Sequence, residues 1–190
     1  ACTRRFLNDS LPRLSNSNAQ GEYYLTDLIA MAVEAGLTVA ASQPAFDWEV
    51  DGVNDRLQLA RLERVYQRVQ ADTLMREGVT LLDPARLDVR GRATVANDVV
   101  IDVNVILEGD VTIGTGVRVG PNCLIRNATL GAGTVVEAHS VIDGALVGEH
   151  CQVGPFARLR PGTELAARAK VGNFVETKKS QIGEGSKVNH

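Results

Sequence analysis

The spacing of apolar residues changes along the chain, and the change separates two regions. In the first 80 residues apolar side chains recur at helical spacing. Thr26 and Asp27 can cap a short apolar helix that runs through Glu34, and Gly36 ends it at the usual C′ position. The segment LTVAA over residues 37–41 is typical of a short strand.

A second, longer helix is predicted to begin at Asp55. Asp55 with Gln58 three residues later forms a capping-box signature, and Gly78 ends the helix. An apolar stripe lies on one side of this helix and includes Leu62, Val65 and Val69. The other residues are mostly Arg, Gln and Glu, so the pattern predicts an amphipathic connector that lies on a neighbouring surface.

From Val89 onward the apolar period is six residues, which fits neither a helix nor a single long strand. This is the hexapeptide repeat of a parallel β-helix, in which each hexad makes one short strand and a turn, and three hexads close a triangular coil. We call the recurring positions rungs. They are Val89, Val95, Ile101, Leu107, Ile113, Val119, Ile125, Leu130, Val136, Ile142, Val147, Val153, Leu159, Leu165, Val171, Thr177, Ile182 and Val188.

Three of the steps between rungs are five residues long, and their positions test the prediction that three hexads make one coil. They run from 125 to 130, from 142 to 147 and from 177 to 182. Counted in hexads from Val89, all three fall on the same corner of the triangle, as expected if three hexads make one coil. Roughly five and a half coils are predicted, about 26 Å long at about 4.8 Å per coil. The period alone does not reveal the hand of the helix.

Composition excludes several classes of function. The net charge of −3 and the lack of a basic run argue against a nucleic-acid partner. Neither an apolar run long enough to span a membrane nor a signal peptide is found, so no membrane partner is expected. Cys123 and Cys151 fall where small interior side chains are expected, and Cys2 is left over. Reduced thiols in a cytoplasmic protein fit this pattern best.

Coil periodicity places several charged residues side by side. Residues 18 apart with no shortened step between them stack on adjacent coils, about 4.8 Å apart. Arg158 then stacks on Glu176, an opposite-charge pair that we expect to be structural. Arg160 stacks on Lys178, and stacked like charges are normally unfavourable. One resolution is an anion shared between the two cations, such as a phosphate.

The same coil periodicity weakens the assignment of an anion site to stacked cations. Lys170 and Lys187 also stack, and both side chains can extend into solvent, so like-charge stacking is not unique to Arg160 and Lys178. The terminal His190 is a candidate for catalysis, but a terminal histidine can be incidental. From periodicity alone, both the anion site and a solvated charge pair stay open.

Six segments together resemble one known family over residues 5–190. The chain is similar to the bacterial bifunctional enzymes of UDP-N-acetylglucosamine synthesis, which are N-acetylglucosamine-1-phosphate uridyltransferases and glucosamine-1-phosphate N-acetyltransferases. The segments are NAQGEYYLTD (18–27), GVNDRLQLARLE (52–63), DPARLDVRG (83–91), VGPFARLRPG (153–162), GNFVETKK (172–179) and GSKVNH (185–190).

The resemblance implies a fold and a division of the chain. Residues 1–54 are expected to be the C-terminal part of the uridyltransferase domain, an α/β remnant of a Rossmann-like nucleotidyltransferase. Residues 55–82 are expected to form the connector helix. Residues 83–190 are expected to form the N-terminal coils of a left-handed parallel β-helix, the acetyltransferase domain, which assembles as a homotrimer in this family. Its left hand is an exception to the usual right-handed crossover.

The resemblance also implies which residues act. Asn54, in the GVN motif, is expected to bind Mg²⁺ and the UDP-sugar product, and Glu22, Tyr24 and Thr26 are weaker candidates for the sugar side of that pocket. In the acetyltransferase site, Arg160 and Lys178 are expected to bind the sugar phosphate, and His190 to be the catalytic base.

The implied substrates suit these residue types. Acetyl transfer from acetyl-CoA to glucosamine-1-phosphate needs a neutral amine, and a His with a pKa near 6.5 can accept its proton. Uridylyl transfer from UTP to N-acetylglucosamine-1-phosphate needs Mg²⁺ to neutralise the triphosphate. Asn54 offers one neutral oxygen, so a carboxylate must come from elsewhere.

Parts of the family pattern are missing from the chain. The Gly-rich phosphate loop and the metal-binding Asp would precede Asn18, and the coils that hold acetyl-CoA would follow His190. We therefore expect a segment of a longer protein that lacks complete sites by itself. Two alternatives stay open: a non-catalytic β-helix that only trimerises as a scaffold, and another hexapeptide-repeat acyltransferase, which is disfavoured because such enzymes lack the 18–27 and GVN segments.

Overall fold

A computed structural model of the protein describes residues 2–189. The chain divides into two compact units, with the boundary between Val50 and Asp51. No helix within the described range is long and apolar enough to cross a membrane.

The first unit is helical. It contains the helices α1 (Arg4–Ser10) and α2 (Asp27–Glu34), and 3-10 turns over Leu11–Arg13 and Asp47–Val50. The predicted end of α2 is confirmed. Gly36 has a φ of +68°, Leu37 N–H donates to Ala32 O at 2.9 Å, and Gly36 N–H donates to Val33 O at 3.0 Å. These two bonds form a Schellman motif that satisfies the last carbonyl groups of the helix.

Two predictions for the first unit are wrong. Residues 37–41 do not form a strand, because none of the described residues up to Val50 forms a strand to which they could hydrogen-bond. Thr26 precedes α2, but its side chain makes no capping bond, since its own backbone is already helical (φ −62°, ψ −24°). An N-cap side chain reaches the first turn from an extended backbone.

The second unit begins with the long helix α3 (Arg56–Arg76), which both predicted caps delimit. The Asp55 carboxylate accepts from Gln58 N–H at 2.7 Å, while the Gln58 side chain accepts from Asn54 N–H at 2.7 Å. The reciprocal bond of the capping box therefore reaches one residue further back than usual. At the other end Gly78 has a φ of +95°, and Val79 N–H donates to Leu74 O.

The buried face of α3 differs from the predicted apolar stripe. Val65 is exposed and Leu62 and Val69 are half-buried, whereas Gln67, Ala71 and Leu74 are buried. Gln67 faces the open edge of the first long strand, β2 (Leu87–Val95). Its amide donates to Val89 O and its carbonyl accepts from Val89 N–H, both at 2.8 Å. The helix thus turns a polar side chain inward because the strand edge needs partners.

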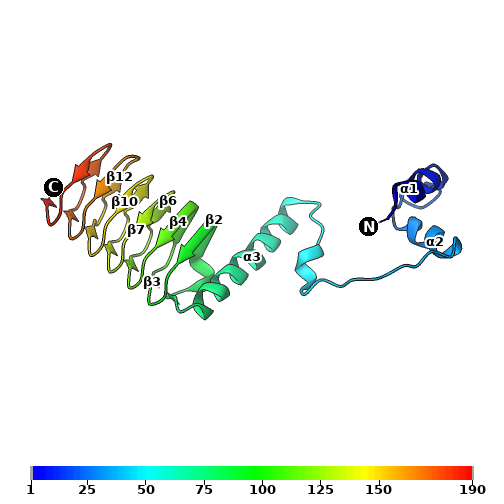
Figure 1. The fold of residues 1–190 in the computed structure, drawn as a ribbon, viewed down its shortest axis with the longest axis horizontal. Helices are drawn as coiled ribbons and strands as arrows, with labels where there is room; N and C mark the ends of the chain where they lie inside the picture. Colours follow the sequence, from blue (N-terminus) through cyan, green and yellow to red (C-terminus); the bar gives the residue numbers. More distant parts are fainter. Residues whose placement is uncertain (1, 190) are drawn as a thin grey trace. The chain divides into compact units, whose positions relative to one another are not determined.

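The strands of the second unit are all parallel and stack into three faces (Figure 1). The first face contains β1 (Thr80–Leu81), β3 (Val100–Ile101), β5 (Arg118–Val119), β8 (Val135–Val136), β11 (Gln152–Val153), β14 (Lys170–Val171) and β17 (Lys187–Val188). The second and third faces share β2 and β4 (Val105–Ile113), which bend from one to the other. The second face continues with β6 (Leu124–Arg126), β9 (Val141–Asp143), β12 (Arg158–Leu159) and β15 (Glu176–Thr177). The third continues with β7 (Thr129–Leu130), β10 (Leu146–Val147), β13 (Glu164–Leu165) and β16 (Gln181–Ile182).

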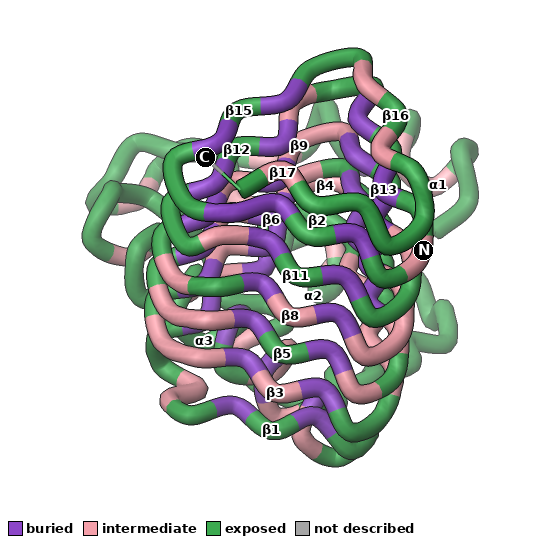
Figure 2. Tube along the Cα trace, turned by 90° about the vertical axis from the view of Figure 1, so that its left-hand side faces the viewer, coloured by how far each residue is buried: buried purple, intermediate pink, exposed green. Residues whose placement is uncertain are grey.

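The predicted β-helix and its rungs are confirmed, and the coils wind as a left-handed parallel β-helix. Every rung is buried except Val95, Ile182 and Val188, which are half-buried. Each rung pairs with the rung of the next coil, as in the series Leu107, Ile125, Ile142, Leu159 and Thr177. Figure 2 shows the result on the first face, where buried positions alternate with exposed ones and align from coil to coil.

The shortened steps also lie where they were predicted. Rungs on the second face are 18 residues apart from Leu107 to Ile125, and 17 apart from Ile125 to Ile142, where a shortened step intervenes. The shortened corners turn through a residue with positive φ, namely Asn127 (45°), Gly144 (58°) and Lys179 (47°). Lys179 is therefore a turn residue, and its side chain is exposed.

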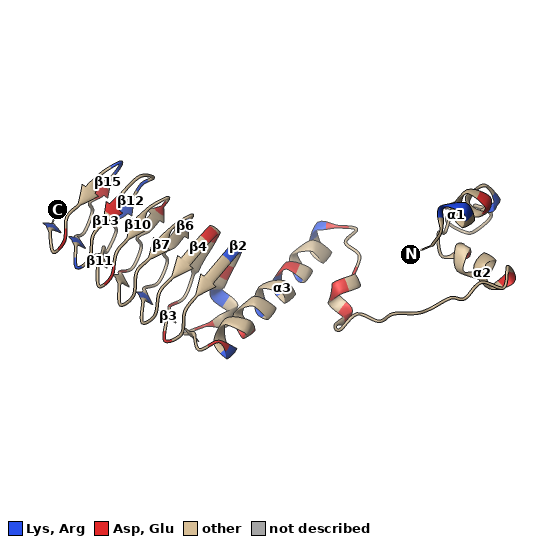
Figure 3. Cartoon of the chain, in the orientation of Figure 1, with Lys and Arg blue, Asp and Glu red and all other residues tan. Residues whose placement is uncertain are grey.

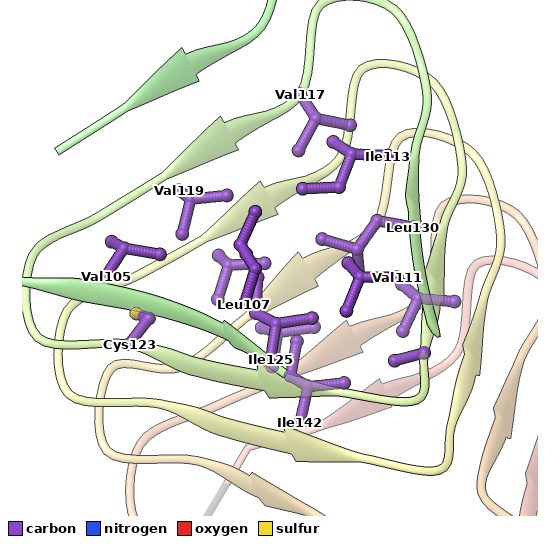
Figure 4. Packing of buried hydrophobic residues seen from close by; sticks show 14 of the residues in the cluster. Val105, Leu107, Val111, Ile113, Val117, Val119, Cys123, Ile125, Leu130 and Ile142 are labelled. Atoms are coloured by element: carbon purple, nitrogen blue, oxygen red, sulfur yellow. The ribbon is translucent and has the colours of Figure 1, made fainter. Parts of the chain in front are cut away.

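The core of the β-helix is a column of aliphatic side chains that point into the triangle from all three faces (Figure 4). Cys123 and Cys151 belong to this core with 1% and 0% of their surface exposed, which confirms their predicted role as small interior residues. Their thiols donate to the carbonyl oxygens of Glu137 and Ala166 at 3.2 and 3.1 Å. Burial raises the pKa of the Cys123 thiol to about 11 and also raises that of Cys151.

The contact between Gln67 and Val89 leads to a stability prediction. Gln67→Leu should lower the free energy of unfolding by about 2–4 kcal/mol, because it leaves a buried N–H and a buried carbonyl of Val89 without their main partner. Chemical denaturation followed by circular dichroism measures the change. Gln70→Leu is the matched control, since its amide lies 3.5 Å from the same carbonyl, at the limit of a hydrogen bond. Equal losses in the two variants would contradict this role for Gln67.

The buried thiols lead to a labelling prediction. At pH 8 a thiol-specific reagent should modify Cys2, which is exposed, and leave Cys123 and Cys151 unmodified. At a pKa of about 11 only roughly one Cys123 thiol in a thousand is ionised at that pH, and burial blocks the reagent as well. Mass spectrometry counts the labels before and after denaturation. A Cys2→Ser variant should take up no label until it unfolds.

Candidate functional site

The candidate site lies on the outer surface of the second face. Side chains directly after the rungs point outward there and form one column, which we call the charged column. Its members are Arg90, Glu108, Arg126, Asp143, Arg160 and Lys178, one per coil. Their charges alternate in sign from Arg90 to Arg160, and the alternation ends with two cations. Figure 3 shows charged residues of both signs on β12 and β15 at this end.

The alternating part of the column is internally paired. Arg126 Nε donates to Glu108 Oε1 at 2.9 Å, and Arg126 Nη1 lies 3.6 Å from Asp143 Oδ2. The hydrogen bond to Glu108, together with the nearby charge of Asp143, raises the pKa of Arg126 above its ordinary value. These three coils carry two carboxylates and one guanidinium, so they leave no cation free for an anionic ligand.

The last two members are in register, as predicted. Leu159 pairs with Thr177, and Arg160 N–H donates to Thr177 O at 2.9 Å, so Arg160 and Lys178 follow their rungs on adjacent strands. The predicted pair of Arg158 with Glu176 is also confirmed, with Arg158 Nη1 at 3.3 Å from Glu176 Oε2. All four residues point to the same side of the sheet, and we call them the charge rectangle.

Arg160 has a partner that the stacking argument did not predict. Its Nη1 donates to Glu176 Oε1 at 2.9 Å, diagonally across the two strands. This hydrogen bond, supported by the charge of Arg158, lowers the pKa of Glu176. Like-charge repulsion is therefore relieved in part by a carboxylate of the chain itself. The reach of diagonal neighbours across a sheet was the signal that could have predicted it.

Lys178 differs from the other two cations of the rectangle in having no carboxylate partner among residues 2–189. Its side chain is exposed and, within residues 2–189, its ammonium group has neither an ion pair nor a hydrogen bond. The rectangle contains three cations and one carboxylate, so two positive charges remain. Such a surface suits an anion with two negative charges, because Arg and Lys are the usual ligands of phosphate groups.

The second like-charge stack lacks this setting. Lys170 pairs with Lys187 on the first face, as predicted, and both are exposed. The positions below Lys170 are Gln152, Val135 and Arg118, which form no alternating series. This pair follows no charge pattern along the coils, so it gives no comparable indication of a ligand.

The other predicted site residues are not brought to the rectangle. His190 lies outside the described residues. Asn54 is exposed just before α3, whereas the rectangle lies in the last coils of the β-helix, so the two are at opposite ends of the second unit (Figure 1). Glu22, Tyr24 and Thr26 belong to the first unit, where the Asn18 side chain shapes their loop by accepting from Gln20 N–H and Glu22 N–H. Their roles stay predictions.

The surroundings of Asn54 do not form a magnesium site by themselves. Asn54 can offer one neutral oxygen, and the neighbouring Asp55 carboxylate already caps α3. Across the described residues no group of three His, Cys, Asp or Glu side chains is placed to hold a metal ion. Mg²⁺ needs several oxygen ligands, usually with one or two carboxylates. The residues that are present therefore do not fit the ion alone.

Comparison with known proteins assigns most of the second unit to a family. The family model described as the GMPPB C-terminal domain matches residues 89–190. The chain belongs to this family. The match begins at the first predicted rung, Val89, and covers all of the predicted rungs.

Relatives extend the similarity over the rest of the chain. It is 62% identical over 190 residues to the Bifunctional protein GlmU of Marinobacter nauticus, and 74% identical over the same length to the protein of that name from Alcanivorax borkumensis. The comparison covers 100% of this chain and 42% of each relative, so the chain spans about two-fifths of their length. The resemblance to a bifunctional family that the motifs indicated is confirmed.

Two solved structures are similar in part. The acetyltransferase domain of PglB from Neisseria gonorrhoeae has a TM-score of 0.32 at 14% identity, covering 67% of this chain and 63% of that chain. A hexapeptide transferase family protein from Anaplasma phagocytophilum has a TM-score of 0.29 at 20% identity, covering 60% of this chain and 76% of that chain.

Proposed function

We propose that this chain is part of a bifunctional enzyme of UDP-N-acetylglucosamine synthesis, and that the charge rectangle binds the phosphate of glucosamine-1-phosphate for acetyl transfer. The observation that carries the proposal is the register of Arg160 and Lys178 at the end of the alternating charged column. The FARLRP, GNFVE and KK motifs and the relatives described as bifunctional proteins support it.

The proposed chemistry divides the work between the two ends of the substrate. Arg160 and Lys178 hold the phosphate and fix the position of the sugar, which places its amine near His190. The amine attacks the thioester carbonyl carbon of acetyl-CoA, its proton passes to the imidazole of His190, and the C–S bond breaks to release coenzyme A as its thiol after protonation. The phosphate contacts act by positioning, and the histidine acts on the reacting nitrogen.

The second activity and the assembly are parts of the same proposal. Uridylyl transfer from UTP to N-acetylglucosamine-1-phosphate would use the site to which Asn54 belongs. Mg²⁺ would neutralise charge on the triphosphate there, and residues other than those around Asn54 would supply its remaining ligands. We further propose a homotrimer, and a cytoplasmic location because free, buried thiols suit a reducing compartment.

Substitution of Lys178 tests the phosphate contact. In the full protein that contains this chain, Lys178→Ala should raise KM for glucosamine-1-phosphate by about 10- to 100-fold, which is the loss expected for a charge-assisted hydrogen bond. Steady-state kinetics of acetylation measures it. Lys179→Ala is the matched control, because Lys179 is the next residue but turns the corner at positive φ. If Lys179→Ala changed KM as much as Lys178→Ala, general surface charge would explain the effect and the contact would be refuted.

One further experiment tests whether the two proposed active sites act independently. His190→Ala should lower kcat for acetyl transfer by about 10²- to 10⁴-fold, the usual contribution of a general base, and leave uridylyl transfer unchanged. Asn54→Ala should lower uridylyl transfer and leave acetylation unchanged. Parallel assays of both reactions measure the pattern. A variant that loses both activities together would argue against two independent sites.

A further inference from the structure

Glu176 binds Arg160, and the proposed function requires the same Arg160 to bind the phosphate of the substrate. Its two carboxylate oxygens are both occupied, Oε1 by Arg160 at 2.9 Å and Oε2 by Arg158 at 3.3 Å. The Glu176 side chain is about half exposed at 48%, and that of Arg160 is 35% exposed. The group is therefore accessible to a ligand and is not locked in the core.

The geometry of the two strands explains the contact. Arg158 lies directly opposite Glu176, and Arg160 lies directly opposite Lys178. Yet the Arg160 guanidinium reaches the diagonal carboxylate of Glu176, at the shorter of the two distances. Repulsion between Arg160 and Lys178 and attraction between Arg160 and Glu176 both favour this diagonal contact. A phosphate placed between Arg160 and Lys178 would have to compete with Glu176 for the same guanidinium hydrogens.

We propose that Glu176 is a built-in competitor of the substrate phosphate: it holds Arg160 while the site is empty and releases it to the phosphate, after which Arg158 alone holds the carboxylate. This inference rests on the proposed function of Arg160 and Lys178. In this exchange Glu176 acts on the phosphate through Arg160, so it is a positioning residue.

Arg158 has a defined part in this exchange. When Arg160 turns to the phosphate, Glu176 would lie close to a dianion, and the two would repel one another. Arg158, which lies 3.3 Å from the carboxylate in this structure, would remain its partner after Arg160 turns to the phosphate. Without Arg158 the carboxylate would depend on Arg160 alone and would compete with the phosphate more strongly.

If Glu176 competes with the phosphate, removing the charge of Glu176 should raise the affinity for glucosamine-1-phosphate. In the full protein, Glu176→Gln should bind glucosamine-1-phosphate roughly 3- to 10-fold more tightly than the unmodified protein, measured by isothermal titration calorimetry without acetyl-CoA. Glu164→Gln is the matched control, since Glu164 is an exposed carboxylate on the third face, where it accepts from the Gln181 amide at 3.4 Å. The control should change the affinity by less than about 2-fold, because solvent screens distant charges.

A double-mutant cycle with Arg158 separates competition from a simple change of charge. Arg158→Gln should weaken binding of glucosamine-1-phosphate, and this loss should be at least about 3-fold smaller when Glu176→Gln is already present. If the two substitutions are additive, or if Glu176→Gln weakens binding, Glu176 only holds the site together and the proposal is wrong. Thermal unfolding confirms that each variant is folded.

The outcomes also separate this inference from the function on which it rests. If Lys178→Ala weakens binding of glucosamine-1-phosphate while Glu176→Gln does not strengthen it, the phosphate site stands and the competition is refuted. If the unmodified protein does not bind glucosamine-1-phosphate, or if Lys178→Ala leaves binding unchanged, the proposed site itself fails and the competition with it.

Discussion

Parallel backbone hydrogen bonds between successive coils, in a register set by the buried rungs, are the constraint on which the second unit depends. One aliphatic side chain per hexad fills the interior, and a slip by one residue would turn the rungs outward. The same register determines every outward position. Residues directly after the rungs must lie above one another, so the charged column follows from the packing of the core.

At the first coil this arrangement leaves one strand edge without a partner strand, and the helix α3 covers that edge. The first long strand, β2, pairs with β4 on one side only, and its other edge carries unpaired peptide groups. The Gln67 side chain imitates a neighbouring strand by offering one donor and one acceptor to Val89. Arg64 adds an ion pair with Asp88 at 2.8 Å, which Arg90 shares. Covering a strand edge in this way is a general means of preventing further strand addition.

The difference between what could and could not be predicted follows from the range of the interactions involved. The rungs, the shortened corners and the pairs Arg158–Glu176 and Arg160–Lys178 depend on spacing along the chain, and spacing is visible in the sequence. The buried face of α3 depends on which groups β2 leaves unpaired, so the apolar stripe, whose members are half-buried or exposed, did not identify it. Residues 37–41 have the composition of a strand, but a strand forms only beside another strand.

At the site, the backbone register was predictable and the side-chain contacts were not. Register places Arg160 about 4.8 Å from Lys178 and makes them neighbours, but a long guanidinium side chain can reach several partners from one backbone position. The choice of Glu176 over an empty position beside Lys178 is decided by charges on three residues at once. A pattern along one column does not contain that information, whereas the two columns of the second face taken together do.

The charge distribution of the column itself favours a ligand over a purely structural role for its last two members. Two unit charges 4.8 Å apart repel by about 1 kcal/mol in water and by about 3 kcal/mol near a protein surface. In the three coils from Glu108 to Asp143 the chain avoids this cost by alternating the sign. At Arg160 and Lys178 it does not, although an acidic residue at position 178 would continue the series. This exception has a cost in a purely structural column, whereas the proposed phosphate site would use the two adjacent cations to hold a dianion.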